Sequence, residues 1–228
     1  MNEISPTKVF ERLSESIPKD CHDNILIIGS LAAGYHFYKD QLKQVRTKDV
    51  DCVIIPRSQA IISGQKVTDT LLNTDWHPVK EGDFSDPGNA ETPDDQLPAV
   101  RLYPPNSTEY FVELLTVPEL NTIQKRSFTR IKVPDREHEG KFLHYGLPSF
   151  RYLILTQWKP INSSYGIHYA RPSMMALANL LEHPTISDDA MSKPIGDQFI
   201  KRSNKDLGRV IALASLTGPE LLDDWAHE

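Results

Sequence analysis

Two short signals near the start of the chain most constrain its fold. The apolar run Ile25–Ile28 ends in Gly29–Ser30, and the run Cys52–Ile55 directly follows a pair of acids, Asp49 and Asp51. Short apolar runs bounded by turn residues predict buried strands. Because side chains alternate along a strand, both aspartates project from one face while their neighbours point into a core.

The segment after Gly29–Ser30 predicts a helix over residues 30–42. Small and apolar residues recur there at helical spacing through Leu31–Tyr38. The order is then strand, tight turn and helix, in which a glycine lets the backbone approach a phosphate and the helix start offers free N–H groups. Ser30 adds a hydroxyl donor at the cap. The plain alternative is a turn and a cap without a ligand, since neither a P-loop nor a dinucleotide fingerprint is present.

The paired acids predict a site for divalent cations. Two adjacent carboxylates repel each other unless cations sit between them, and Mg²⁺ binds through carboxylates and substrate phosphates. The alternative for Asp49 and Asp51 is an acidic strand end on the surface, or two helix caps.

Glu113 is a candidate third acid. It interrupts an apolar run in the second of two expected strands, Ala99–Leu102 and Tyr110–Thr116. A charged residue in such a run is rarely buried without a partner or a metal. Three acids on neighbouring strands would hold two metal ions about 3.5–4 Å apart. The alternative is a salt bridge from Glu113 to Arg101.

The pattern resembles the polymerase-beta-like nucleotidyltransferase superfamily. Gly29–Ser30 matches its glycine-serine motif, Asp49 and Asp51 match its paired metal carboxylates, and Glu113 matches its third carboxylate. Within the superfamily, the segments 28–36 and 47–51 look most like bacterial nucleotidyltransferases of the abortive-infection type, which are toxins of type IV toxin–antitoxin pairs. Two departures are the long gap between Ser30 and Asp49 and the glutamate in third position.

The resemblance covers residues 20–120 and implies an α/β fold: a nucleotidyltransferase-type mixed sheet with flanking helices, followed by a mainly helical C-terminal region. It implies transfer of a nucleoside monophosphate from a nucleoside triphosphate, with Mg²⁺ or Mn²⁺, to an RNA end (tRNA included) or a protein hydroxyl. An antitoxin protein would be a partner. Lys205, in the pair Lys205–Asp206, would reach the triphosphate; otherwise it is a surface pair.

Three other functions remain open at the level of sequence. One is a non-catalytic regulatory or interaction protein on the same fold. A second is an aminoglycoside-type nucleotidyltransferase, which shares the motifs and differs in its acceptor. A third is a glycosyltransferase that uses Asp-x-Asp to hold a manganese-bound sugar nucleotide, although the Gly-Ser turn before the acids speaks against it.

Periodicity predicts the remaining elements. A catalytic domain is expected over residues 1–120 and a mainly helical domain over residues 121–228. The expected helices are 1–17, 66–73, 149–158, 172–182 and 197–216, and the further expected strands are 24–28, 49–55 and 76–79.

Charge and composition bound the partners. The formal net charge of −6 argues against non-specific nucleic-acid binding. Six acids and no base in residues 81–95 predict a solvated loop, whereas the basic stretches 124–141 and 193–209 suit a triphosphate or an acidic acceptor. No membrane span or signal-peptide pattern is present, and the two cysteines are expected to be free thiols, so a cytoplasmic protein without membrane contact is expected.

Overall fold

The computed structural model describes residues 3–41, 44–80, 86–119, 126–182, 191–194, 201–225 and 227. Its fold is mixed α/β, as the sequence predicts, and a seven-stranded sheet of order β10-β11-β2-β4-β7-β6-β5 is its centre. The strands of this sheet are β2 (Ile25–Ile27), β4 (Asp49–Ile54), β5 (His77–Pro78), β6 (Arg101–Tyr103), β7 (Phe111–Thr116), β10 (Ile161–Asn162) and β11 (His168–Tyr169).

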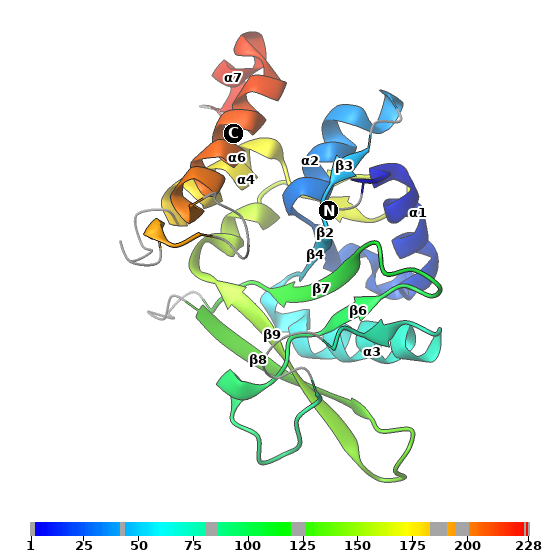
Figure 1. Cartoon of the computed structure of the whole chain (residues 1–228). Helices are drawn as coiled ribbons and strands as arrows, with labels where there is room; N and C mark the ends of the chain where they lie inside the picture. Colours follow the sequence, from blue (N-terminus) through cyan, green and yellow to red (C-terminus); the bar gives the residue numbers. More distant parts are fainter. Residues whose placement is uncertain are drawn as a thin grey trace.

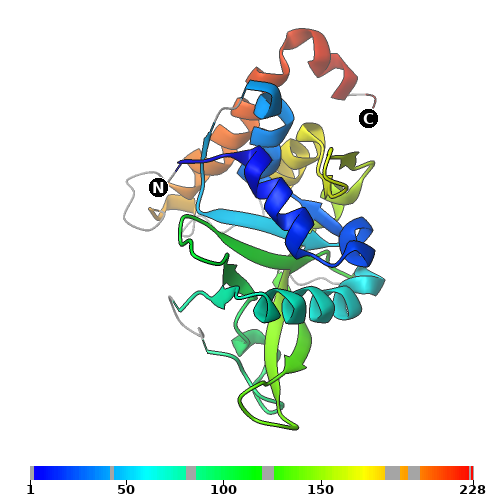
Figure 2. The same cartoon turned by 90° about the vertical axis from the view of Figure 1, so that its right-hand side faces the viewer.

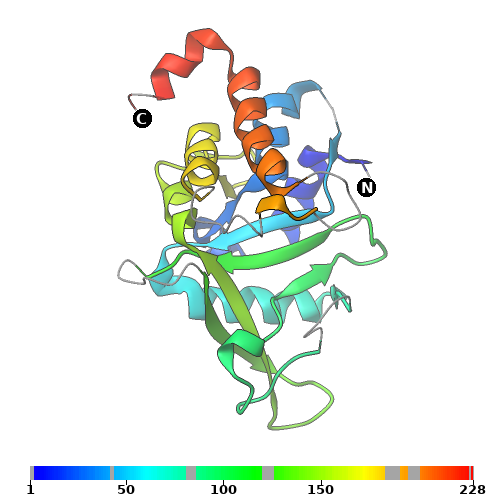
Figure 3. The same ribbon diagram turned by 60° about the vertical axis from the view of Figure 1, so that its left-hand side comes forward.

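Helices cover both faces of the sheet (Figures 1 and 2). The views place α1 and α3 on one side and α4 and α6 on the other, and Figure 3 shows α6 standing over strands β4 and β7. The α-helices are α1 (Pro6–Ser16), α2 (Gly29–Tyr38), α3 (Ala60–Asn73), α4 (Pro172–Glu182), α6 (Arg202–Thr217) and α7 (Pro219–Trp225). The 3-10 helices are η1 (Lys19–Asn24), η2 (Lys39–Gln41), η3 (Arg57–Gln59), η4 (Asp94–Gln96) and η5 (Arg151–Gln157).

Side chains alternate between the two faces of β4 as the sequence predicts. Val50, Cys52 and Ile54 are fully buried, whereas Asp49 is exposed and Asp51 partly so. On the buried side α3 approaches closely at Gly64, where a Cβ would lie 3.2 Å from the Ile54 side chain. Both cysteines of the chain are buried free thiols, as expected.

Strands in the second half are the main difference from the sequence analysis. Residues expected to be a basic stretch form β8 (Arg126–Pro134), which pairs with β9 (Phe142–Phe150) in a separate antiparallel hairpin. The expected helix 149–158 is β9 followed by η5. The short strand β11 joins the central sheet, parallel to β2. No helix in the described part of the chain is long and apolar enough to cross a membrane.

Smaller differences concern the ends of elements. The first helix begins at Pro6, because residues 3–4 form strand β1 (Glu3–Ile4), which pairs with β3 (Val45–Arg46). The helix expected at 66–73 begins earlier, at Ala60. Part of the acidic loop (81–85), the first residues of the basic stretch (124–125) and the start of the last expected helix (197–200) lie outside the described residues.

Candidate active site

The Gly-Ser turn lies directly against the paired acids. Strand β2 ends at Ile27, and the backbone N–H of Ile28 donates to the carbonyl oxygen of Asp51 at 3.0 Å. Gly29 then starts α2 with a φ of +71°, and a Cβ at this position would lie 2.9 Å from Oδ2 of Asp51. Only glycine accommodates both the left-handed backbone and this close approach.

The start of α2 differs in detail from the expected cap. Ile28 is the N-cap residue, no side chain caps the helix, and Ser30 is an exposed residue of its first turn. The first N–H groups of a helix have no partner within the helix and favour an anion. Ser30 is therefore placed beside an uncapped helix end, and not in the capping role predicted for it.

The three acids lie on neighbouring strands of one sheet face. β4 and β7 are parallel, and their register places Asp51 opposite Glu113 and Asp49 opposite Phe111. Burial and the charges of Glu113 and Asp49 raise the pKa of Asp51 to about 7, against an ordinary value of 3.8. The sequence-predicted acids are thus close enough to repel one another.

Glu113 also makes the alternative contact that the sequence left open. Arg101 is its register partner on β6, and Nη2 of Arg101 donates to Oε1 of Glu113 at 3.2 Å. In the part of the chain that the structure describes, no three acid, histidine or cysteine side chains converge closely enough to hold a metal ion as they stand. The carboxylate of Glu113 is turned toward Arg101, which separates it from that role in this conformation.

Helix α6 carries a second set of positive charges near the acids, in addition to Arg101. The charges of Arg209 and Lys205 act on Asp51, and both lower its pKa. Lys205 is partly buried; burial and the nearby Arg209 lower its own pKa, while Asp49 opposes that shift. Arg202 pairs with Asp206 at 3.7 Å. Lys205 is therefore close enough to the acids for their charges to interact, and its predicted role of binding the triphosphate stays a prediction.

Arg202 and Arg209 are site residues that the sequence analysis did not select. Together with Lys205 they recur at positions i, i+3 and i+7 of α6, which places them on one helical face. That spacing was visible in the sequence within the basic stretch 193–209. α6 begins at Arg202, so Lys193 and Lys201 of the basic stretch lie outside this helix.

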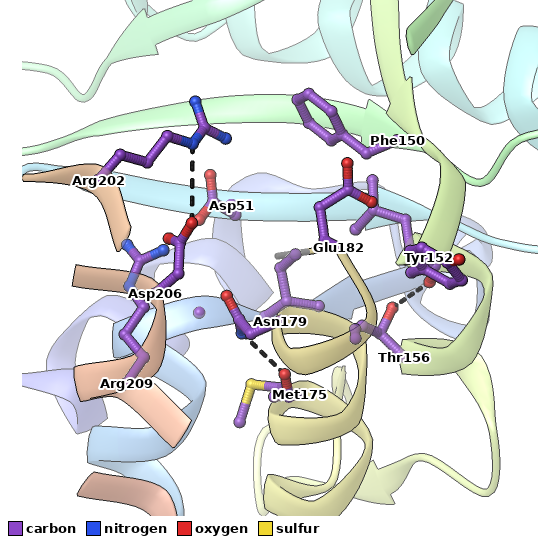
Figure 4. A pocket seen from close by; sticks show the side chains of 14 residues that line it. Asp51, Phe150, Tyr152, Thr156, Met175, Asn179, Glu182, Arg202, Asp206 and Arg209 are labelled. Carbon is purple, nitrogen blue, oxygen red and sulfur yellow. Dashed lines mark hydrogen bonds and ion pairs between the residues drawn. The ribbon is translucent and has the colours of Figure 1, made fainter. Parts of the chain in front are cut away.

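A cavity of about 210 Å³ opens between Asp51 and the C-terminal helices. Figure 4 shows Arg202, Asp206 and Arg209 reaching into it from α6, with Asn179 and Glu182 on α4 and Asp51 on β4. Its remaining lining includes Ile28, Gly29, Phe150, Tyr152, Leu153, Thr156, Met175 and Ala178. The combination of acids, cations and aromatic walls suits a polar organic ligand with a ring.

A second cavity, of about 300 Å³, adjoins the first. The two share Gly29, Met175, Asn179 and Arg209, so they form neighbouring compartments around the start of α2. The second compartment is largely apolar, lined by α2, α4, α6 and β3. Its further lining residues are Ser30, Ala33, Gly34, Tyr38, Val45, Arg46, Ala212, Leu213 and Leu216.

Comparison with known proteins adds little to this geometry. No protein-family model matches the chain, and no curated protein matches it. Among solved structures, an antigenic nucleotidyltransferase-like protein from Paracoccidioides brasiliensis is similar, with a TM-score of 0.39 and 16% sequence identity over 96% of this chain and 80% of that chain. At this distance the similarity carries no weight for the chemistry of the chain.

Proposed function

We propose that the chain is a nucleotidyltransferase, which moves a nucleoside monophosphate from a nucleoside triphosphate to an acceptor hydroxyl. The observation that carries the proposal is the close approach of the Asp51 carboxylate to Gly29, where an added Cβ would lie 2.9 Å from Oδ2. It joins an uncapped helix start, an acid cluster and the basic face of α6 in one place. An anion with bound cations is the ligand that satisfies all three groups.

Each group has a role in this proposal. The N–H groups at the start of α2 and the hydroxyl of Ser30 bind the β- and γ-phosphates. Lys205 and Arg209, on α6, neutralise the phosphate charge. Binding in these places orients the α-phosphate toward Asp51 and restricts its motion, which lowers the entropic part of the barrier.

Asp49, Asp51 and Glu113 would hold Mg²⁺ or Mn²⁺. Carboxylate oxygens are the donors that these ions prefer, and a cation would relieve the repulsion that raises the pKa of Asp51. Such ions supply charge neutralisation at the reacting phosphate when bound. Glu113 has to leave its ion pair with Arg101, at least with one oxygen, to join them.

The transfer step balances with these groups. The acceptor hydroxyl oxygen forms a bond to the α-phosphorus, and the bond from that phosphorus to the bridging oxygen breaks. Pyrophosphate leaves with the electron pair, and the hydroxyl proton passes to Glu113. Displacement in line is the geometry that two-metal sites favour.

The decisive experiment offers each labelled nucleoside triphosphate with Mg²⁺ to the wild type, Asp51→Asn and the loop control Asp95→Asn. Total RNA, a protein lysate and an aminoglycoside serve as acceptors in separate reactions. Label transferred by the wild type and Asp95→Asn, but lost in Asp51→Asn, supports the proposal. Equal labelling by all three proteins would falsify it.

One rival has a specific observation in its favour. The Arg101–Glu113 ion pair occupies the third acid, which is what a nucleotide-binding protein without transfer activity would retain. Saturable, Asp51-dependent triphosphate binding without transfer to any acceptor would establish that rival. The narrower role of a toxin rests on the resemblance alone, and growth arrest on expression of the wild type but not of Asp51→Asn would support it.

A further inference from the structure

The second cavity, of about 300 Å³, has no role in the proposed transfer reaction. Two helices line it, each with residues at helical spacing. The residues on α2 are Ser30, Ala33, Gly34 and Tyr38, and those on α6 are Arg209, Ala212, Leu213 and Leu216. Because residues at these spacings share one face of a helix, the cavity follows the facing sides of α2 and α6.

Small and apolar side chains form the middle of this cavity. Ala33 and Gly34 on α2 present at most a methyl group to it. Gly34 lies against strand β3, where a Cβ would clash with the side chain of Val45, and Val45 is itself part of the wall. The buried Leu213 of α6 and Met175 of α4 add larger apolar surfaces. A hydrocarbon body therefore suits the middle of the cavity.

One end of the cavity favours an anion. Gly29 and Arg209 line both cavities, so this end is where the second compartment meets the first. The start of α2 lies here without a capping side chain, and the first N–H groups of a helix favour a negative charge. The planar guanidinium of Arg209 matches a carboxylate. Arg46, which lines the second cavity alone, is paired with Glu3 at 3.0 Å, so its charge is already balanced.

We propose that this cavity is a second ligand site, which binds an amphipathic carboxylate. The hydrocarbon body lies between α2 and α6, and the carboxylate lies at Arg209 and the start of α2. The stretch of α2 from Ser30 to Tyr38 is about 12 Å long, at ~1.5 Å per residue, so an acyl chain of medium length can lie along it. The site itself does not depend on the proposed function.

Occupation of this site would be coupled to donor binding. In the proposed function, Arg209 and the start of α2 bind the β- and γ-phosphates. A carboxylate on the same groups competes with the triphosphate, and each ligand weakens the binding of the other by the same factor. An amphipathic acid would therefore inhibit transfer. This coupling, unlike the site, rests on the proposed function.

The test measures binding of decanoate by calorimetry, below its micellar concentration and without nucleotide or Mg²⁺. Butyrate tests the need for the hydrocarbon body, and decylamine tests the sign of the head group. Ala212→Phe is the main variant, because Ala212 is an exposed residue of the cavity wall and an added ring fills the space. Ser215→Phe is the matched control, since Ser215 is also exposed on α6 but does not line the cavity.

Decanoate is expected to bind the wild type and Ser215→Phe equally. Ala212→Phe should bind it at least about tenfold more weakly, since each CH₂ group that is no longer buried loses about fourfold in affinity. Arg209→Gln should also lose about tenfold, through the carboxylate. Butyrate and decylamine should bind the wild type far more weakly than decanoate. Decanoate should shift the NMR signal of the Met175 methyl group but not that of Met174, which lines neither cavity.

The inference is overturned when decanoate does not bind the wild type, or when Ala212→Phe binds it like the wild type. Decylamine that binds as tightly as decanoate also overturns it, because apolar surface alone would then explain the binding. Loss of triphosphate binding in Ala212→Phe, with no decanoate binding by the wild type, would assign the cavity to the base of the donor nucleotide.

Triphosphate binding in the presence of Mg²⁺ separates these failures from that of the proposed function. A wild type that binds decanoate but no triphosphate supports the second site and contradicts the proposed function. A wild type that binds triphosphate but no decanoate does the reverse. Decanoate that binds without weakening triphosphate binding overturns the coupling between the two sites.

Discussion

Gly29 at the start of α2 and Asp51 on β4 lie so close together that a Cβ on Gly29 would stand 2.9 Å from Oδ2 of Asp51. Replacement by alanine therefore has two effects. The left-handed backbone at φ +71° costs about 1–3 kcal/mol, and the added methyl group pushes the carboxylate away.

Gly29→Ala is expected to lose triphosphate binding as well as stability, measured by calorimetry and denaturant unfolding. Gly140→Ala is the matched control. Gly140 has a similar φ of +77° but nothing within 4 Å of its added Cβ, so it has the same backbone strain without the contact. Equal triphosphate binding by the two variants would show that the contact with Asp51 is unimportant.

The raised pKa of Asp51 predicts a stability that falls as pH rises. An acid with a pKa of about 7 in the folded protein and 3.8 in the unfolded chain binds more protons when folded. The folded state is then favoured at low pH, and this advantage is lost between about pH 4 and about pH 7. Without metal, Asp51→Asn should be on the order of 2–4 kcal/mol more stable than wild type at alkaline pH.

Denaturant unfolding of the two proteins across this pH range checks the prediction. Their curves should converge toward acid pH, because the wild-type carboxyl is then protonated in both states. Asp95→Asn controls for a change of net charge alone. Parallel curves for wild type and Asp51→Asn would contradict the raised pKa.

Cation binding should depend on the same proton. A divalent ion requires the carboxylate form of Asp51, so Mg²⁺ or Mn²⁺ affinity should fall about tenfold for each pH unit below the pKa of about 7. Calorimetry in buffers of different ionisation enthalpy measures the proton released. Asp51→Asn should bind the ion weakly at every pH, and Asp95→Asn should retain the wild-type profile.

Arg209 is expected to bind donor phosphate and to hold Asp51 in its charged form. Arg209→Gln should weaken triphosphate binding about tenfold, or ~1.4 kcal/mol. Since the Arg209 charge lowers the pKa of Asp51, its loss should also shift the pH midpoint of cation binding upward. Arg136→Gln, which removes an arginine paired with Asp69 on the hairpin side, should change neither quantity.

The side chain of Arg130 is expected to stabilise the packing of the β8–β9 hairpin against the loop that precedes β6. Its Nε donates to Asp94 at 2.8 Å, and its Nη1 donates to the carbonyl oxygen of Asn89 and to Nδ1 of His144, each at 3.1 Å. Arg130→Gln should reduce the free energy of unfolding by about 1–3 kcal/mol and speed proteolysis of residues 86–96. Lys132→Gln, two residues along the strand, should leave both unchanged.

The site was predictable where local pattern decides the geometry. Alternation on β4 put Asp49 and Asp51 on one face, and the glycine at the strand end marked the close approach. The register that brings Glu113 beside Asp51 and Arg101 was harder, because parallel pairing of β4 and β7 depends on the whole sheet. The structure shows the ion-pair alternative for Glu113, and its role as the third metal carboxylate stays a prediction.

The missed hairpin has a physical cause. Buried Thr129, Ile131 and Val133 alternate along β8 as a strand requires, but the basic residues between them dominate the composition. In β9, Gly146 and Pro148 are residues that usually interrupt strands. Strands of two residues, such as β11, leave no hydrophobic period to detect.

The parallel pairing of β4 with β7 ties the chemistry to the core. A shift of one residue along either strand would exchange its two faces, burying acids where Val50 or Val112 now lies. A form of the sheet with a shifted register would therefore lose folding stability, whatever the effect of the shift on activity. The side-chain alternation that exposes the acids therefore also selects the register during folding, because only the correctly paired sheet keeps its apolar side chains in the core and its acids on the other face.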